Sequence, residues 1–446
     1  MASLFSIAEI IAATGGQAHN IKAENISSVS IDSRSIAKGA LYVPIVGERF
    51  DGHDFVEGAL KNGAVVALVS KEHANRFSGL ATIIVPDTLE AMVDIARAAR
   101  MRSKAKIIAI TGSAGKTTTK SMVAQILQEE GKTHASIKSF NNHWGVPLML
   151  ANMAADTQFG VFEIGMNHSG EIIPLVELVS PHIALITSIG AAHLGNFNNI
   201  EGIARAKAEI FSGLMPDGCA IINSDHDHME ILISQARLDG VQNITSYGFG
   251  QEADVKITNY KVQDQTSSAY ISMADDEFTL KLAVHGTHSI ANAAGALIIA
   301  DCLGVDMNKA LESLEKFEAS KGRGEVLLFG AGNKTIELID ESYNANPSSM
   351  AAALAVFSQR KRRGGNRILV LGEMLELGAN SNQAHMDLAA AINACSANKV
   401  FMVGKHMQVL KPAIEPYSEV FLTNDAKQIC PQIVNGLDWE DQIMVK

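Results

Sequence analysis

The sequence predicts an α/β protein with three domains: a small N-terminal α/β domain, a central P-loop domain with a parallel sheet, and a C-terminal Rossmann-like domain. A chain of 446 residues exceeds what one core normally holds, and at roughly 150 residues a domain it suggests about three domains. Short β-branched runs alternate with helical stretches along the chain, which is typical of parallel sheets. A glycine-rich, charged break at 319–325 separates two such series.

Residues 1–85 are predicted to form the small N-terminal domain. Residues 1–16 are predicted to form a short amphipathic helix rather than a signal peptide, because they lack a basic leader and Glu9 interrupts their apolar stretch. Three β-branched runs follow, separated by turn residues, at 27–31, 41–46 and 64–69.

Residues 86–318 are predicted to form the central domain. A helical stretch from Thr88 to Ser103 leads into the apolar strand KIIAI at 106–110, then a glycine loop and a helix that starts near Lys116. Further apolar strands alternate with helical stretches, which predicts a parallel sheet covered on both faces. These strands are VFEIG (161–165), IALITSIG (183–190) and CAIIN (219–223).

Residues 319–446 are predicted to form the C-terminal domain. Strands alternate with helices here too, which predicts a second Rossmann-like unit. We expect the break at 321–324 to act as its hinge. The predicted strands are TIELID (335–340), RILVLG (367–372), KVFMVG (399–404) and EVFL (419–422).

Composition narrows the possible partners. A net charge of −11 argues against nucleic acid or a membrane surface as a partner. The four cysteines are far apart and form no C-x-x-C pair, so we expect neither a zinc site nor a disulfide. This use of cysteine is typical of proteins in a reducing cytoplasm, where we expect the protein to act. The most apolar later window, 288–304, is interrupted by His288, Asn292 and Asp301, so we expect no membrane insertion.

The stretch ITGSAGKTTTK at 110–120 has the pattern of a phosphate-binding P-loop, except that Ile110 stands where the first glycine is usual. It lies between a buried strand and a helix, so backbone amides and a helix N-terminus can face phosphates while Lys116 reaches their outer oxygens. Thr117 occupies the Mg²⁺ position. The alternative is an ordinary strand-to-helix turn in which G-K-T occurs by chance.

Lys207 lies in the middle of an apolar helical stripe. In one explanation its stem packs and its ammonium group reaches water. In the other its pKa is depressed, and the neutral amine reacts with CO₂ to form a carbamate, an oxygen ligand for Mg²⁺. The stripe comprises Ile200, Ile203, Ala204, Ile210, Phe211 and Leu214.

Glu163 lies near the C-terminal end of the predicted strand over 161–165 and His193 comes after the one over 183–190, where a doubly wound sheet places its ligands. Alone, each is a weak signal. With Thr117 and Lys207, however, they predict a site for two Mg²⁺ ions that hold the γ-phosphate of ATP.

Several longer motifs are similar to those of the Mur ligase family. TGSAGKTTTK fits the P-loop variant shared by Mur ligases and folylpolyglutamate synthases, and AKAEI around Lys207 fits the position of a carbamylated lysine in Mur ligases, which favours the carbamate. The resemblance runs from about Asp32 to the last residue. Its other motifs are SFNNHWGVP, EIGMNHSGEI, IDESYNANPSSM and LGEMLELG with His385.

The resemblance implies roles for individual residues. The catalytic group would be Lys116, Lys207, Glu163 and His193, with the metals on Thr117, Glu163, His193 and carbamylated Lys207. ATP would contact Gly112, Ser113, Ala114, Gly115, Lys116, Thr117, Thr118, Asn292, Arg323 and Asp340. The substrates would contact Ser33, Arg34, Gly47, Phe50, Asp51, Gly52, His53, Asn141, Asn142, Asn344 and Asn346.

The resemblance also implies an activity. It is strongest with the branch of the family that joins D-alanyl-D-alanine to UDP-N-acetylmuramoyl-tripeptide in peptidoglycan synthesis, using ATP and two Mg²⁺ through an acyl phosphate. The N-terminal domain would bind the uridine diphosphate, and we expect a monomer. The alternatives are a tripeptide-forming Mur ligase, whose D-N-P-R signature is absent, a P-loop kinase or GTPase, and a non-catalytic nucleotide-binding module.

Two departures from the family pattern stand out. Glu341 occupies a position where aspartate is common, which keeps the charge on a longer side chain. The ending WEDQIMVK resembles the strand just before a V-K-G-S-R turn and a terminal helix, so the resemblance implies a shortened C-terminal domain.

Overall fold

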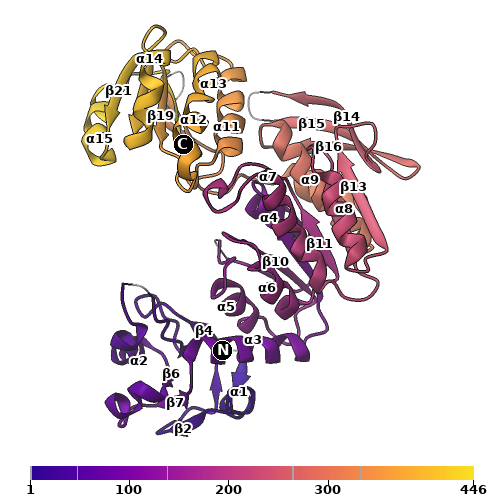
Figure 1. The fold of residues 1–446 in the computed structure, drawn as a ribbon, viewed down its shortest axis with the longest axis vertical. Helices are drawn as coiled ribbons and strands as arrows, with labels where there is room; N and C mark the ends of the chain where they lie inside the picture. Colours follow the sequence, from indigo (N-terminus) through magenta and orange to yellow (C-terminus); the bar gives the residue numbers. More distant parts are fainter. Residues whose placement is uncertain (1–2, 48, 138, 264–265, 332–333) are drawn as a thin grey trace.

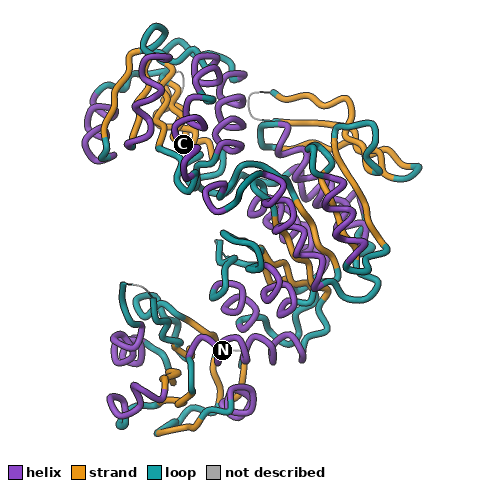
Figure 2. The backbone as a smooth tube through the Cα atoms, in the orientation of Figure 1, coloured by secondary structure: helices purple, strands orange, loops and turns teal. Residues whose placement is uncertain are grey.

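The computed structural model describes residues 3–47, 49–137, 139–263, 266–331 and 334–446. Three bodies follow one another along an arc, and each contains its own sheet with helices packed against it (Figures 1 and 2). The predicted α/β fold with three bodies is therefore confirmed, whereas the boundaries at residues 85 and 318 stay predictions.

The N-terminal body contains a five-stranded sheet of order β2-β7-β6-β5-β4, parallel except for β2. The strand expected over 41–46 ends at Tyr42, two residues before Pro44, which has no amide hydrogen to donate to a neighbouring strand. Its elements are β1 (Phe5–Ser6), α1 (Ile7–Thr14), β2 (Gln17–His19), β3 (Asn25–Ile26), β4 (Ser28–Ser30), β5 (Ala40–Tyr42), α2 (Val56–Asn62), β6 (Val66–Ser70) and β7 (Thr82–Val85).

Helix α1 is shorter than expected because its ends are fixed by specific residues. Ser6 and Glu9 form a capping box, in which each side chain accepts a hydrogen bond from the other residue's backbone amide. Gly15 ends the helix with a φ of 62°, a conformation that favours glycine. Glu9, whose charge argues against a signal peptide, therefore stabilises the first turn of this helix.

Helix α3 (Thr88–Arg102) joins the N-terminal and central bodies. The carboxylate of Asp87 caps its first turn by accepting from the amides of Leu89 and Glu90. One side of the helix packs on α1 and another on α5 (Gly145–Ala151) and α6 (Ile172–Val179) of the central body. The two bodies thus share one hydrophobic cluster through this helix.

The central body is built on a nine-stranded sheet of order β16-β15-β14-β13-β12-β11-β8-β10-β9. Its strands are β8 (Lys106–Thr111), β9 (Thr133–Ala135), β10 (Phe159–Glu163), β11 (Ile183–Ile186), β12 (Cys219–Asn223), β13 (Asn243–Gly248), β14 (Val255–Val262), β15 (Ser267–Met273) and β16 (Asp276–Leu282). Its remaining helices are α4 (Lys116–Glu130), α7 (Ile200–Ala208), α8 (Met229–Leu238), α9 (Thr287–Cys302) and α10 (Met307–Glu315).

The expectation of a parallel central sheet was right only as far as β14. Strands β14, β15 and β16 pair antiparallel, because the short connections between them leave no room for a crossover helix. Two expected elements are also shorter: the strand over 183–190 ends at Ile186, and the helix over 200–214 ends at Ala208 before a 3₁₀ turn.

The C-terminal body has a six-stranded sheet of order β17-β18-β22-β19-β20-β21, parallel except for β17. The buried carboxylate of Glu337 ties this sheet to α11 through Arg360, at 2.6 Å. Its elements are β17 (Glu325–Ala331), β18 (Lys334–Asp340), α11 (Pro347–Gln359), β19 (Arg367–Gly372), α12 (Ser381–Met386), α13 (Ala389–Ala394), β20 (Lys399–Val403), α14 (Lys411–Ile414), β21 (Glu419–Thr423), α15 (Ala426–Asn435) and β22 (Gln442–Val445).

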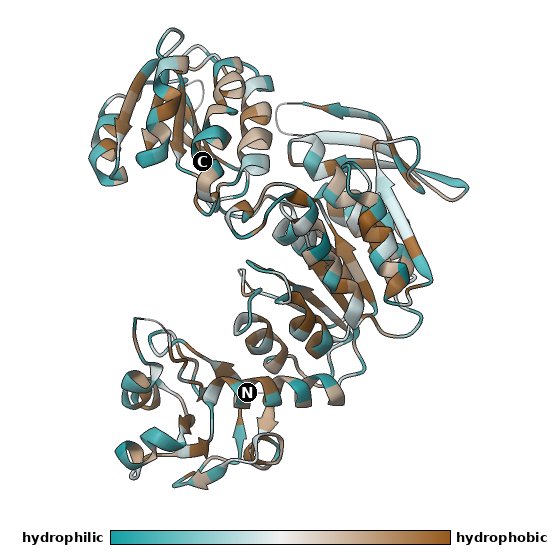
Figure 3. Ribbon diagram, viewed as in Figure 1, coloured by the Kyte–Doolittle hydropathy of each residue, from teal (hydrophilic) through white to brown (hydrophobic). Residues whose placement is uncertain are grey.

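Hydrophobic residues concentrate on the inner strands of all three bodies (Figure 3). Strand β8 lies between β10 and β11, and four of its residues in a row, Ile107 to Ile110, are completely buried. This strand leads directly into the glycine loop, so its packing fixes where the loop begins. Among the described residues, no helix is both long and apolar enough to cross a bilayer.

We predict that Ile108→Ala destabilises the protein by about 2–5 kcal/mol, because the lost side-chain atoms leave a cavity between the sheet and α4, which packs on this face. Chemical denaturation followed by circular dichroism measures this free energy of unfolding. The control is Ile137→Ala, since that side chain is 63% exposed and its loss should change stability by less than about 0.5 kcal/mol. Equal effects of the two variants would contradict the assigned packing.

Candidate functional site

A cavity of about 590 Å³ lies where strands β8, β10 and β11 end, and residues of both the central and C-terminal bodies line it. It brings together most of the site residues predicted for these two bodies. They are Ser113, Ala114, Gly115, Lys116, Thr117, Thr118, Asn141, Glu163, His193, Lys207, Asn292, Arg323, Asn344 and Asn346.

The glycine loop is held in place by the segment that follows β11. The amide of Ser113 donates to the carbonyl of Ser188 at 2.9 Å, and its hydroxyl donates to the carbonyl of Gly190 at 3.0 Å. Gly115 has a φ of 84° and caps α4, so the first amides of that helix face the cavity. A helix N-terminus of this kind binds phosphate.

The ammonium group of Lys116 lies over the loop and donates to the carbonyl of Gly112 at 2.6 Å. Burial lowers the pKa of Lys116, the charge of Glu163 opposes that shift, and the charge of Arg323 adds to it. The ammonium group of Lys116 and the guanidinium of Arg323, which comes from the C-terminal body, line the same cavity. Two cations in one cavity favour an anionic ligand there.

Glu163 is the most deeply buried acid of the cavity, with 1% of its surface exposed. Its carboxylate accepts hydrogen bonds from the hydroxyl of Thr117 and the side-chain amide of Asn141, both at 2.8 Å. Among the described residues no cationic group lies within ion-pairing distance of it. A hydroxyl and a carboxylate held side by side next to a phosphate loop are the oxygen donors that Mg²⁺ prefers, so these residues fit the ion.

Lys207 is only 1% exposed. Of the two explanations that the sequence allowed, the structure therefore agrees with a buried amine and not with an ammonium group that reaches water. Burial lowers the pKa of Lys207 well below its usual value, and the charge of Lys116 lowers it further. Within the described part of the chain its ammonium group pairs with no carboxylate. The amine is therefore held in surroundings that favour its neutral, nucleophilic form.

His193 belongs to the loop after β11 and has a φ of 60°, uncommon for a residue with a side chain. Its Nδ1 lies 2.5 Å from the carboxylate of Glu376, a residue of the C-terminal body. Burial lowers the pKa of His193, the bond to Glu376 opposes the shift, and the charges of Lys207 and Lys116 support it. A neutral imidazole in this position can bind a metal.

The C-terminal body contributes further groups to the cavity. The guanidinium of Arg323 lies 3.9 Å above the ring of Tyr343, whose hydroxyl donates to that of Ser139 in the central body. The side chain of Asn346 caps α11 by accepting from the amide of Ser349, so much of its role is structural. The side chain of Lys446 also lines the cavity and lies 3.6 Å from Glu341.

Three predicted residues do not line the cavity. Gly112 forms the bottom of the glycine loop and contacts Thr187 closely. Asn142 accepts from the amide of Gly145 and so fixes the start of α5, and Asp340 accepts from the amide and hydroxyl of Ser342. Their assignment to ligands stays a prediction.

The remaining predicted substrate residues all lie in the N-terminal body, outside this cavity. Arg34 is 87% exposed and pairs with Asp32, whose pKa it lowers to about 2. Gly52 packs against the backbone of Ile45 so closely that any side chain would collide with it. The other residues of this group are Ser33, Gly47, Phe50, Asp51 and His53, of which Phe50 is exposed and His53 buried.

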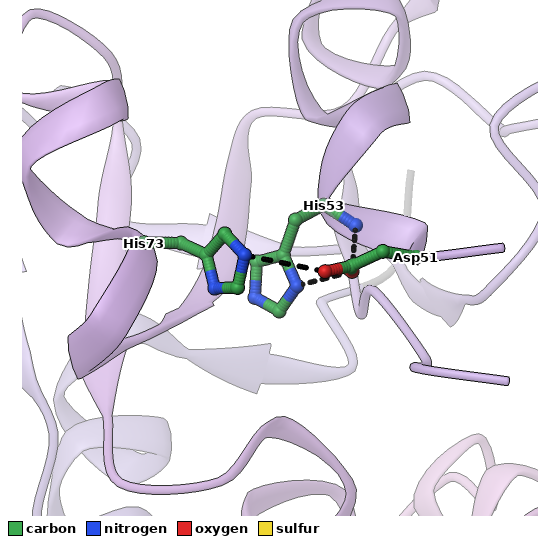
Figure 4. A group of neighbouring side chains, drawn as sticks. All are labelled: Asp51, His53 and His73. Atoms are coloured by element: carbon green, nitrogen blue, oxygen red, sulfur yellow. Dashed lines mark hydrogen bonds and ion pairs between the residues drawn. The ribbon is translucent and has the colours of Figure 1, made fainter.

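Asp51, His53 and His73 form a compact cluster in this body (Figure 4). The donor set could suit a metal ion, but the geometry does not. Both nitrogens of His53 are occupied, since Nδ1 lies 2.7 Å from Asp51 and Nε2 accepts from the amide of Ser70. The two rings stack 4.0 Å apart and nearly parallel, so they cannot both direct a lone pair at one ion. The cluster instead fixes the loop that carries Asp51.

Sequence reasoning missed several residues that line or border the cavity. Ser139 belongs to a quoted motif, and Tyr343 and Glu376 lie within two others, so a signal existed, but motif membership does not say which side chain reaches another body. Asp225 and Phe249 carried no signal, because small polar residues and single aromatics after strands are common. Ser188 and Asn223 were placed within the predicted strands over 183–190 and 219–223 and were given no role.

Comparison with known proteins shows three matching domain families. Residues 25–105 match the Mur ligase family catalytic domain, 110–300 the Mur ligase middle domain, and 322–446 the Mur ligase glutamate ligase domain. A Rickettsia prowazekii protein named UDP-N-acetylmuramoyl-tripeptide–D-alanyl-D-alanine ligase is 34% identical over 95% of this chain and 92% of its own length.

Solved structures of proteins named MurF are similar to this chain as well. Acinetobacter baumannii MurF is 31% identical, with a TM-score of 0.86 over 99% of this chain and 95% of that one. Thermotoga maritima MurF, solved in complex with ADP, has a TM-score of 0.78 over 94% of this chain and 93% of that one. At 23% identity the latter likeness shows the fold alone.

We predict that Gly115→Ala weakens ATP binding at least tenfold without unfolding the protein. A methyl group there would lie 2.5 Å from Oδ1 of Asn292, and the φ of 84° disfavours any side chain. The backbone amides of the glycine loop, which face the cavity, would therefore shift. Isothermal titration with ATP and Mg²⁺ measures the effect. Gly79→Ala is the control, since nothing lies within 4 Å of the added methyl group. Unchanged affinity in Gly115→Ala would show that this loop does not hold ATP.

Proposed function

The chain belongs to the Mur ligase family, and from that membership we propose that it joins D-alanyl-D-alanine to UDP-N-acetylmuramoyl-tripeptide. It is an ATP-dependent, amide-forming ligase. The product is a UDP-N-acetylmuramoyl-pentapeptide, with ADP and phosphate released.

One observation carries this proposal: a P-loop, a buried carboxylate and a buried lysine of the central body share a single cavity with residues of the C-terminal body. A kinase or GTPase that used only Lys116 and Thr117 would give no reason for Asn344 and Arg323 to face the same cavity. A ligase needs such a second body, because ATP and an amine must be held against the same carboxylate.

The chemistry follows from the poor reactivity of a carboxylate, whose leaving group would be an oxide. Transfer of the γ-phosphoryl group of ATP to the peptide carboxylate gives an acyl phosphate with a good leaving group. The amine of the dipeptide then forms the amide bond, and phosphate leaves. Lys116 and Arg323 offset the charge of the phosphate oxygens, and holding the two reactants together supplies on the order of 7–11 kcal/mol in favourable cases.

Mg²⁺ bound at Thr117, Glu163 and His193 would neutralise charge on the phosphates. The buried carboxylate of Glu163 and the adjacent hydroxyl of Thr117 support this assignment. We assign Lys207 a carbamate, because its buried amine has a lowered pKa and no acidic partner among the described residues. The carbamate would add one more anionic oxygen ligand.

The nucleotide-sugar end of the substrate is assigned to the N-terminal body, through Arg34 and the loop carrying Asp51 and Gly52. Its peptide end must reach the cavity of the central body. Closure of the C-terminal body about residues 321–324 would bring the dipeptide to it, and Gly322 and Gly324, both with positive φ, are suited to such a turn. We propose a monomer that acts in the cytoplasm, in keeping with its free thiols.

We predict that phosphate release from ATP requires both UDP-N-acetylmuramoyl-tripeptide and D-alanyl-D-alanine, with one pentapeptide nucleotide formed per phosphate. A coupled phosphate assay with each component omitted in turn, and mass spectrometry of the product, measures both quantities. Replacing the dipeptide by a free third-residue amino acid, with the UDP-dipeptide as acceptor, controls for a tripeptide-forming ligase. Turnover only in that control would overturn the proposal.

We predict that Lys207→Ala lowers kcat at least a thousandfold while the fold and ATP binding are kept, because the variant lacks the carbamate oxygens. In the wild-type protein, ¹³CO₂ should produce a carbamate carbon resonance that is missing from Lys207→Ala. Lys309→Ala, an exposed lysine on α10, is the control and should keep both activity and the resonance. Near-normal turnover of Lys207→Ala would exclude the carbamate.

A further inference from the structure

In the C-terminal body, the turn after β19 contacts the loop after β11 that carries His193, here called the metal-ligand loop. The carboxylate of Glu376 accepts a hydrogen bond from Nδ1–H of His193, and its backbone carbonyl accepts from the amide of Gly195 at 2.9 Å. Because an ionised carboxylate can only accept, the proton must lie on Nδ1. The lone pair of the neutral ring is therefore on Nε2.

The two loops approach so closely that their backbones require glycine. A side chain at Gly195 would lie 2.8 Å from the carbonyl of Glu376 and 2.9 Å from the amide of Gly378. Both His193 and Glu376 adopt positive φ, at 60° and 61°. Such conformations persist in residues with side chains only when the surroundings fix them, and here each loop fixes the other.

Other contacts show that this turn lies within a docked interface. The hydroxyl of Tyr343 donates to Ser139, and Gly190 packs against the side chain of Ser348 on α11. None of these other contacts involves a proposed metal ligand. Glu376 is thus the described residue of the C-terminal body that hydrogen-bonds directly to one of the four proposed ligands.

We propose that Glu376 is a positioning residue for the metal site, which the C-terminal body supplies when it docks. By accepting from Nδ1–H, it holds His193 in the tautomer and orientation that leave Nε2 for Mg²⁺, as carboxylates commonly do for metal-binding histidines. Metal binding and docking of the C-terminal body are therefore coupled. This inference rests on the proposed magnesium site, and it goes further by placing one determinant of that site in another body.

Binding of Mn²⁺ as a paramagnetic probe, in the presence of ADP, tests the inference without turnover. Glu376→Ala is expected to raise the Kd for Mn²⁺ about 10- to 100-fold and to weaken the ¹⁴N modulation from His193 in electron spin echo spectra. Glu376→Gln keeps the length of the side chain and should show a smaller effect in the same direction. Unfolding temperatures near that of the wild type would establish that both variants are folded.

Glu373→Gln is the matched control, because Glu373 lies in the same turn but accepts from the amide of His406 within its own body. It should bind Mn²⁺ as the wild type does. Gly195→Ala leaves the carboxylate in place and separates the two loops, so it should also raise the Kd.

Wild-type Kd and ¹⁴N modulation in Glu376→Ala would overturn the proposal, and a wild-type Kd in Gly195→Ala would overturn its coupling to docking. These results can be told apart from a failure of the proposed function. That failure would appear as absent ligation by the wild-type protein, whatever the Mn²⁺ affinities of the variants.

Discussion

The site depends on one buried charge, the carboxylate of Glu163 at the end of β10. An ionised group in the interior is costly unless it is hydrogen-bonded, and here Thr117 from the P-loop helix and Asn141 from a separate loop supply the bonds. Those bonds fix the helix and the loop relative to the sheet. They also leave a hydroxyl and a carboxylate together in a cavity that already contains Lys116 and Lys207, so phosphate and metal chemistry become possible there.

The position of the site at the edge of the central sheet also explains how the other two bodies contribute. The carboxyl ends of the parallel strands lie at one edge of the central sheet, which is where α/β folds bind their ligands. The C-terminal body covers it and adds Arg323 and Tyr343, while α3 ties the N-terminal body firmly to the central one. The contact between Glu376 and His193 then links the geometry of the metal site to the position of the covering body.

Features that depend on neighbours in sequence were predictable, and features that depend on docking were not. The strand, loop and helix around Lys116 follow from local pattern, and Lys207 could be found because a charge interrupted an apolar stripe. The bond between Glu376 and His193 joins residues 183 positions apart in different bodies, which no periodicity reveals. The antiparallel strands β15 and β16 were missed because alternating helices and strands elsewhere favoured a wholly parallel sheet.

The central claim is that the peptide carboxylate takes the γ-phosphoryl group of ATP inside this cavity. The direct measurement is isotope transfer from UDP-N-acetylmuramoyl-tripeptide labelled with ¹⁸O in its terminal carboxylate, during turnover with ATP and D-alanyl-D-alanine. The account predicts one ¹⁸O atom in each phosphate released, observed as a mass or ³¹P shift. Phosphate free of label, with the ¹⁸O atom that the carboxylate loses recovered in water, would contradict it.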